Sequence, residues 1–185
     1  MELIGHNGGP SVAEGESWRR LCWAKARADL LPTLPIEVLR TRVRRAKDLG
    51  LEYRTYASVR AATGHDVVAF LFSSNALRVT VQAVVPRDRA EKLMDLVDVR
   101  RIGLALGRLD AGALGQANPD VLDAAYPAPG PWAKFGEAAR ILRVAMGRIS
   151  GDRVLLVGDT TLERDWCAAG RLAGFLTAER YFGAV

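Results

Sequence analysis

The sequence predicts an α/β protein in which a basic, helical N-terminal segment precedes a domain built on a mostly parallel sheet. Charge gives the first indication, because residues 18–64 contain 11 Lys and Arg against 4 Asp and Glu, whereas residues 65–185 contain 15 against 14. Hydrophobic patterning gives the second, because short, wholly apolar runs such as residues 67–72 alternate with amphipathic stretches after residue 65. Strands that alternate with helices in this way are typical of a parallel sheet covered by helices.

Composition limits the class of protein. The chain has 185 residues, of which 49% are hydrophobic, and a formal net charge of +5, so it can bury a substantial core. No apolar run approaches the roughly 18 residues that a membrane span needs, and the first residues lack the features of a secretion signal. Cys22 and Cys167 belong to no metal-ligand or redox motif. We therefore expect a cytoplasmic protein without disulfides, cofactor or metal.

Residues 1–16 are expected to be a flexible leader, since Gly8, Gly9 and Pro10 favour a turn and cannot start a helix. The segment IGHNGGP, residues 4–10, resembles the IGHN-x-x-P openings of a group of uncharacterised bacterial proteins, several of them phage-associated. That resemblance implies no particular activity. A peptide that docks on a protein partner is the alternative to a flexible arm.

Residues 17–64 are expected to form three basic helices. Ser17 can cap the first helix, and Pro35 suits the first position of the second. Gly50 suits the position just beyond the second helix, and Gly64 ends the third. The expected bounds are residues 17–31, 35–49 and 53–63. The apolar stripe of the second helix consists of Ile36, Leu39, Val43 and Ala46.

The second and third helices match the pattern of a helix-turn-helix. That motif favours a small residue in its first helix, a glycine four residues later in the turn, and apolar residues around the turn and in its second helix. These positions hold Ala46, Leu49, Gly50, Leu51, Tyr56 and Val59, whereas Arg45 stands where an apolar residue is expected. The third helix would read nucleic acid with Arg54, Thr55, Ser58 and Arg60, while Arg42, Arg44 and Lys47 would contact the backbone. A basic helical cap on the following domain is the alternative.

Residues 65–185 are expected to form a Rossmann-like three-layer domain. Wholly apolar runs predict strands at residues 67–72, 102–106 and 154–157, and residues 79–85 form either a strand or an extended connection. Amphipathic spacing predicts a helix from Pro86, a second over residues 132–149, and a last one from Thr160 to about Leu176, begun by a capping box with Glu163. Residues 109–131 are expected to be a long connection with one helical turn near residues 119–125.

In sheets of this kind, ligands bind beyond the carboxyl ends of the strands. Two polar loops are expected there, one of Ser73, Ser74 and Asn75, and the other of Asp159, Thr160 and Thr161. The second loop also begins a helix, where the N–H groups and the helix dipole favour an anion. These six residues are therefore the candidates for binding a phosphate-bearing small molecule.

Two segments, residues 67–73 and 154–159, resemble the first and last motifs of the haloacid dehalogenase-like phosphatases. The resemblance implies an α/β sheet, two aspartates at the end of the first strand, one of them the nucleophile, and a Mg²⁺-binding aspartate in a Gly-Asp loop. Gly158 and Asp159 keep the last feature. Leu71, Phe72 and Ser73 stand where the first motif needs its aspartates, so neither the aspartyl-phosphate nor the metal site can be built.

Serine catalysis is not expected either, because Ser73 or Ser74 would need a base within hydrogen-bond reach. His6 lies in the leader, and His65 lies at the opposite end of the same strand, about 20 Å away; a lysine base stays open. We therefore expect a non-enzymatic binding or regulatory protein that contacts DNA or RNA through its basic helices. The alternatives are an adaptor without a nucleic-acid role, and an enzyme or binding domain for a phosphate-bearing ligand.

Overall fold

A computed structural model describes residues 34–183 of the chain, which divides into two units, residues 1–39 and 40–185. The sheet and the helices that cover it belong to the second unit. The predicted leader and the first predicted helix, with His6 and Cys22, lie outside the described residues. The domain boundaries expected at residues 16 and 64 stay predictions. Within residues 34–183, no helix is long and apolar enough to cross a membrane.

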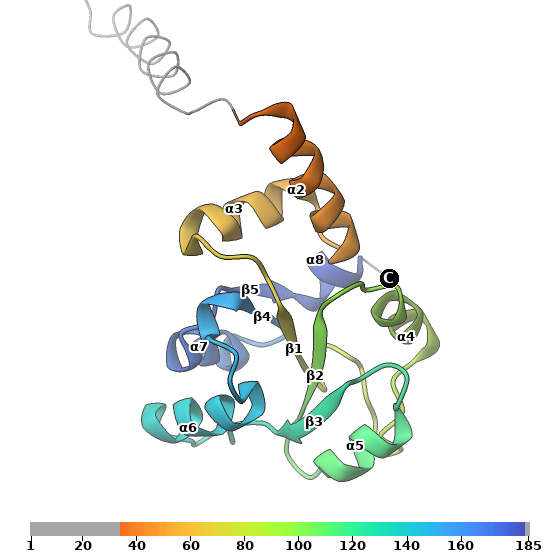
Figure 1. Ribbon diagram of the computed structural model, residues 1–185. Helices are drawn as coiled ribbons and strands as arrows, with labels where there is room; N and C mark the ends of the chain where they lie inside the picture. The colour runs from red at the N-terminus through yellow and green to blue at the C-terminus, as the bar shows by residue number, and fades with distance from the viewer. Residues whose placement is uncertain (1–33, 184–185) are drawn as a thin grey trace, which may run out of the picture. The chain divides into compact units, whose positions relative to one another are not determined.

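Five parallel strands form one sheet in the order β3-β2-β1-β4-β5 (Figure 1). Their bounds are Ala69–Ser73 for β1, Arg100–Ala105 for β2, Ala124–Pro127 for β3, Val154–Gly158 for β4 and Gly174–Thr177 for β5. The central strand, β1, pairs with both β2 and β4. The chain places β2 and β3 on one side of β1 and then returns to place β4 and β5 on the other, so the strand order reverses between β1 and β4. The predicted α/β class and its parallel sheet are confirmed.

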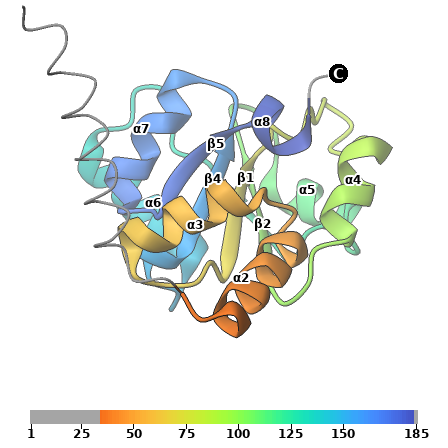
Figure 2. The same ribbon diagram turned by 90° about the horizontal axis from the view of Figure 1, so that it is seen from above.

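Helices cover both faces of the sheet and give three layers (Figure 2). The helices are α2 Ile36–Asp48, α3 Tyr53–Thr63, α4 Arg87–Met94, α5 Ala111–Ala117, α6 Phe135–Met146, α7 Thr161–Gly170 and α8 Ala178–Phe182, with a 3₁₀ turn at Gly151–Arg153. Side chains of α3, α4, α5 and α8 share one hydrophobic cluster with Phe70 and Phe72, and those of α6 and α7 share another with Leu71. Successive side chains of β1 thus point to opposite faces of the sheet, as strand geometry requires.

The aromatic residues near the C-terminus pack on the core. Tyr181 is buried, its ring centroid lies 5.3 Å from that of Phe70, and its hydroxyl donates a hydrogen bond to the Leu49 carbonyl at 3.2 Å. Phe182 lies edge-on to Tyr181, with ring centroids 5.0 Å apart. This short last helix therefore ties the α2–α3 turn to the sheet.

The long connection predicted over residues 109–131 is wrong, because that stretch holds α5 and β3. Leu114 is the only large apolar residue in α5, and the helix start depends on the Asp110 carboxylate, which accepts a hydrogen bond from the Ala113 N–H at 2.7 Å. The edge strand β3 has only four residues. Elements so short and so rich in Gly and Ala carry little hydrophobic periodicity.

The predicted last helix is too long. α7 ends at Gly170, because Arg171 takes a left-handed backbone conformation with φ 51°. Leu176, assigned to the inner face of that helix, belongs instead to β5 and is buried. Residues 79–85 form a connection with turns, which settles the alternative between a strand and a connection.

Candidate functional site

The turn between α2 and α3 is built as the sequence predicts. Gly50 has φ +63°, its N–H donates to the Lys47 carbonyl at 2.9 Å, and the Leu51 N–H donates to the Ala46 carbonyl at 2.9 Å. This pair of bonds satisfies carbonyls at the end of α2 in a Schellman arrangement, which needs a residue that tolerates positive φ. Ala46 and Leu49 are buried, and α3 begins four residues beyond Leu49, at Tyr53.

Arg45, the residue that departs from the helix-turn-helix pattern, points inward, and all three of its guanidinium nitrogens donate hydrogen bonds within the protein. Its Nε lies 3.0 Å from a carboxylate oxygen of Asp66, and its guanidinium donates to the carbonyls of Val67 at 3.0 Å and Val97 at 2.9 Å. These carbonyls belong to the segments that lead into β1 and β2. An arginine thus replaces the expected apolar contact and fastens α2 to the start of two strands.

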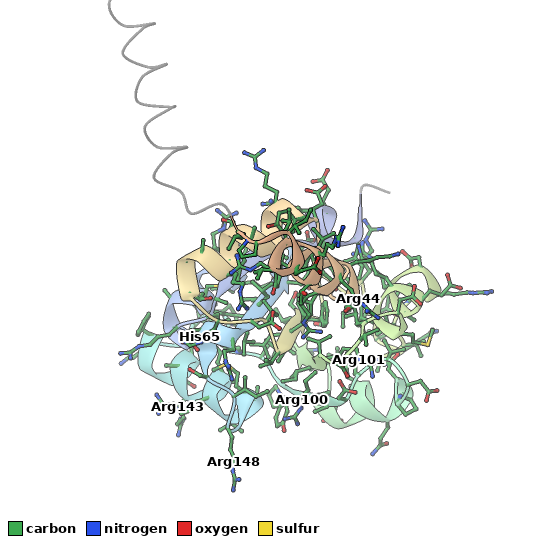
Figure 3. All side chains as sticks on the ribbon, turned by 45° about the horizontal axis from the view of Figure 1, so that its top comes forward. Arg44, His65, Arg100, Arg101, Arg143 and Arg148 are labelled. Carbon is green, nitrogen blue, oxygen red and sulfur yellow. The ribbon has the colours of Figure 1, made fainter. Side chains whose placement is uncertain are left out.

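The exposed face of α2 carries the cations. At 100° per residue, Arg44 lies on the side of the helix away from Ala46 (Figure 3). Lys47 lies to one side of Ala46, and both cations are exposed. Arg42 turns toward the Ala46 side and is half-buried. In the described part of the chain, neither Arg44 nor Lys47 pairs with an acidic residue.

The predicted exposed face of α3 needs two corrections, at Thr55 and Arg60. Arg54 and Ser58 are exposed, but Thr55 is only 6% exposed, and its hydroxyl accepts a hydrogen bond from the Arg180 guanidinium at 2.8 Å. Arg60 is half-buried near Tyr56. Burial and the hydrogen bond to Asp66 raise the pKa of Tyr56, and the Arg60 charge opposes that rise.

Of the seven residues predicted to contact nucleic acid, four are exposed. We call these four, Arg44, Lys47, Arg54 and Ser58, the basic α2–α3 surface. Ala61 and Ala62, the next exposed residues along α3, leave the end of its outer face almost without side chains.

Comparisons with family models, with curated proteins and with solved structures found no match to this chain. Its function is therefore inferred from its own residues.

The two predicted polar loops follow β1 and β4, which are neighbours in the sheet, so they lie side by side at its carboxyl edge. Glu163, in α7, is wholly buried between them. Its carboxylate accepts hydrogen bonds from the backbone N–H groups of Asp159 at 2.5 Å and Thr160 at 2.8 Å, and from the side-chain amide of Asn75 at 3.1 Å. The predicted capping box is confirmed, since the Thr160 hydroxyl accepts from the Glu163 N–H at 3.3 Å.

This internal carboxylate stands where the sequence predicts an external anion. The N–H groups of Asp159 and Thr160 are already satisfied by Glu163, so an anion bound there would have to displace it. Asn75, Asp159, Thr160 and Thr161 are exposed. Ser73 and Ser74 are buried: the Ser73 hydroxyl accepts from the Ala76 N–H at 3.1 Å, and the Ser74 hydroxyl accepts from the Leu106 N–H at 3.2 Å.

His65 lies at the amino end of β1, as predicted (Figure 3). Its Nε2 is 3.4 Å from a carboxylate oxygen of Asp152, which precedes β4, so this pair sits at the edge of the sheet opposite to Ser73. Among the residues that the structure describes, no group of three or more His, Cys, Asp and Glu side chains is arranged to hold a metal ion.

Proposed function

We propose that the protein binds nucleic acid through the basic α2–α3 surface. The observation that carries this proposal is that some arginines are bonded within the protein whereas others are not. Arg45 and Arg180 are bound to carbonyl, carboxylate and hydroxyl groups of the protein itself, whereas Arg44 and Arg54 have no acidic partner within the described residues. Unpaired, exposed cations on two consecutive helices suit phosphate groups outside the protein.

Local charge supports the same partner. Residues 40–64 contain seven Lys and Arg but only two acidic residues, Asp48 and Glu52. Each phosphate that a cation neutralises releases counterions, so affinity for a polyanion depends steeply on salt. The local excess of positive charge therefore favours a nucleic acid over a neutral partner.

The residue types suit the two kinds of contact that nucleic-acid recognition uses. Arg54 can donate two parallel hydrogen bonds to a guanine edge or to a phosphate, and Ser58 can contact either. Lys47 supplies a point charge for a phosphate. The Gly50-capped turn between α2 and α3 is short enough for a helix-turn-helix, which supports α3 as the reading helix of this proposal.

Paired variants test the proposal. We expect Arg44→Ala with Arg54→Ala to weaken oligonucleotide binding and to lower the salt slope by about 0.9 for each duplex phosphate contact that is lost. Arg143→Ala with Arg148→Ala is the matched control, because it removes the same charge from exposed sites at α6, apart from α2 (Figure 3). Equal losses in the two double variants would mean that net charge alone, and not this surface, determines binding.

A protein partner is the second candidate, and one observation favours it. Of the predicted apolar stripe of α2, Val43 in the second unit is 46% exposed, and Ile36 and Leu39 in the first unit are 62% and 38% exposed. Exposed apolar side chains, where they gather, are typical of surfaces that bind protein. The two candidates differ in salt dependence, since apolar contacts do not weaken as salt rises to 200 mM, about where phosphate contacts have lost most of their strength.

A further inference from the structure

A cleft of about 530 Å³ opens at the carboxyl edge of the sheet, between the loop that follows β1 and the start of α5. Ser74, Asn75 and Thr80 line one side, and Arg108 lines the other. The remaining lining is mostly apolar and includes Leu106 and Leu109. Both the volume and the mixture of an apolar lining with a few polar groups are typical of sites for small molecules.

The place of the cleft in the fold suits a ligand. Sheets of this topology bind ligands beyond the carboxyl ends of their strands, most often where the strand order reverses. Here the reversal lies between β1 and β4, and that crevice is closed by the hydrogen bond from Asn75 to Glu163. The opening is therefore displaced by one strand, to the ends of β1 and β2.

The wall formed by the loop after β1 is held in a fixed conformation. Asn118, only 4% exposed, accepts a hydrogen bond from the Val85 N–H at 2.8 Å and donates to the Ala83 carbonyl at 2.7 Å. Arg78 and Ala83 have positive φ, at 54° and 58°, although neither is glycine. Non-glycine residues keep such conformations only where the surroundings impose them, and these residues gather at functional sites.

The positive charge of Arg108 in the cleft favours an anionic ligand. Arg108 is exposed and has no acidic partner among the described residues. Asp110, the neighbouring carboxylate, accepts from the Ala113 N–H as the cap of α5 and is thereby partly neutralised. Val81, which also lines the cleft, is 97% exposed, so a ligand with an apolar body would remove it from water.

We infer that this cleft binds a small organic anion whose apolar body packs on the loop after β1 and on Leu109, and whose carboxylate or phosphate pairs with Arg108. Asn75 and Thr80, which are exposed, supply hydrogen bonds that orient the ligand. The inference does not depend on nucleic-acid binding, because none of these residues belongs to the basic α2–α3 surface.

Amide NMR spectra of the full chain test the inference. The probes are hexanoate, benzoate and phenyl phosphate, each compared with an uncharged counterpart, hexanol, benzyl alcohol and phenol. We expect saturable shifts confined to residues 74–83 and 106–113, with tighter binding of at least one anion than of its counterpart. Arg108→Gln should remove that preference, Ala113→Trp should fill the cleft and remove binding, and Arg148→Gln should behave as the unaltered chain does.

Three results would overturn the inference. One is the absence of saturable shifts in these two segments for every probe. Another is an equal affinity for charged and uncharged members of every pair in the unaltered chain. The last is an anion preference that survives in Arg108→Gln, whose fold the same spectra report.

Discussion

The side-chain amide of Asn75 donates a hydrogen bond of 3.1 Å to the carboxylate of Glu163, which joins the loop after β1 to the first turn of α7. The same carboxylate accepts from two backbone N–H groups at the start of that helix. The crevice in which Rossmann-like sheets often hold an anion is thus filled by the protein's own anion. The two sites proposed for this protein, the cleft at the ends of β1 and β2 and the basic α2–α3 surface, therefore lie outside that crevice.

Glu163→Gln should lower the free energy of unfolding by about 2 kcal/mol, because it weakens charge-assisted hydrogen bonds to a buried group and brings an amide N–H₂ toward backbone donors. Urea unfolding measures the change. Glu137→Gln is the control, since Glu137 lies in the first turn of α6 but is exposed. Equal stability of the two variants would show that the buried carboxylate is not a structural link.

Arg45→Met should also cost about 2 kcal/mol, because three backbone carbonyls would lose their donor while the Asp66 carboxylate would lose its cation. Arg44→Met, one position earlier on the exposed face, should change stability by no more than about 0.5 kcal/mol. Thermal or urea unfolding compares the two. A reversed order would contradict the assignment of Arg45 as the inward arginine.

Arg78→Gly should leave the protein as stable as before, or more stable by up to about 1 kcal/mol. Glycine relieves the positive φ of this residue, and the substitution removes a like charge near Arg89. Burial, and next the charge of Arg78, lower the pKa of Arg89. Thr80→Gly is the control in the same loop, and because φ of Thr80 is not positive it should lower the free energy of unfolding by about 0.5–1 kcal/mol. A similar loss of stability in Arg78→Gly would show that the positive φ of Arg78 is not strained.

Asp123 should give stability that depends on pH. Burial alone would raise its pKa, but the hydrogen bonds and the charge of Arg101 outweigh burial and lower the pKa. A carboxylate with a lowered folded-state pKa stabilises the fold above its unfolded pKa of about 3.9, and this contribution is lost as pH falls through the folded-state value. Asp123→Asn should therefore be less stable than the unaltered chain at pH 7, and the difference should shrink in acid. A difference that is constant with pH would contradict the pairing.

Much of the fold follows from short-range signals. Gly50 and Thr160 mark helix ends through their own backbone and hydroxyl groups, so α2, α3 and the start of α7 could be predicted. The shared edge of the two polar loops also follows, because parallel strands place their carboxyl ends together. The short elements α5 and β3 could not be predicted, since their stability comes from packing and not from a pattern of their own.

The parts of the candidate site that escaped prediction depend on distant partners. From the sequence, Thr55 is predicted to be an exposed contact residue, but Arg180, 125 residues later, donates a hydrogen bond to it. In the helix-turn-helix pattern, Arg45 is a mismatch, but its side chain donates hydrogen bonds to Asp66 and to the Val97 carbonyl, which lie 21 and 52 residues away. The Asn75–Glu163 bond spans 88 residues. No local pattern encodes pairs of this kind.

Fluorescence anisotropy with labelled duplex and single-stranded oligonucleotides, across about 50 to 200 mM salt, tests the proposed function most directly. If Arg44, Lys47 and Arg54 each neutralise one phosphate, the logarithm of the duplex affinity should fall against the logarithm of salt with a slope of about −2.7. Binding with such a slope would support the basic α2–α3 surface as a nucleic-acid interface. No binding at the lowest salt, or an affinity that salt leaves unchanged, would contradict it.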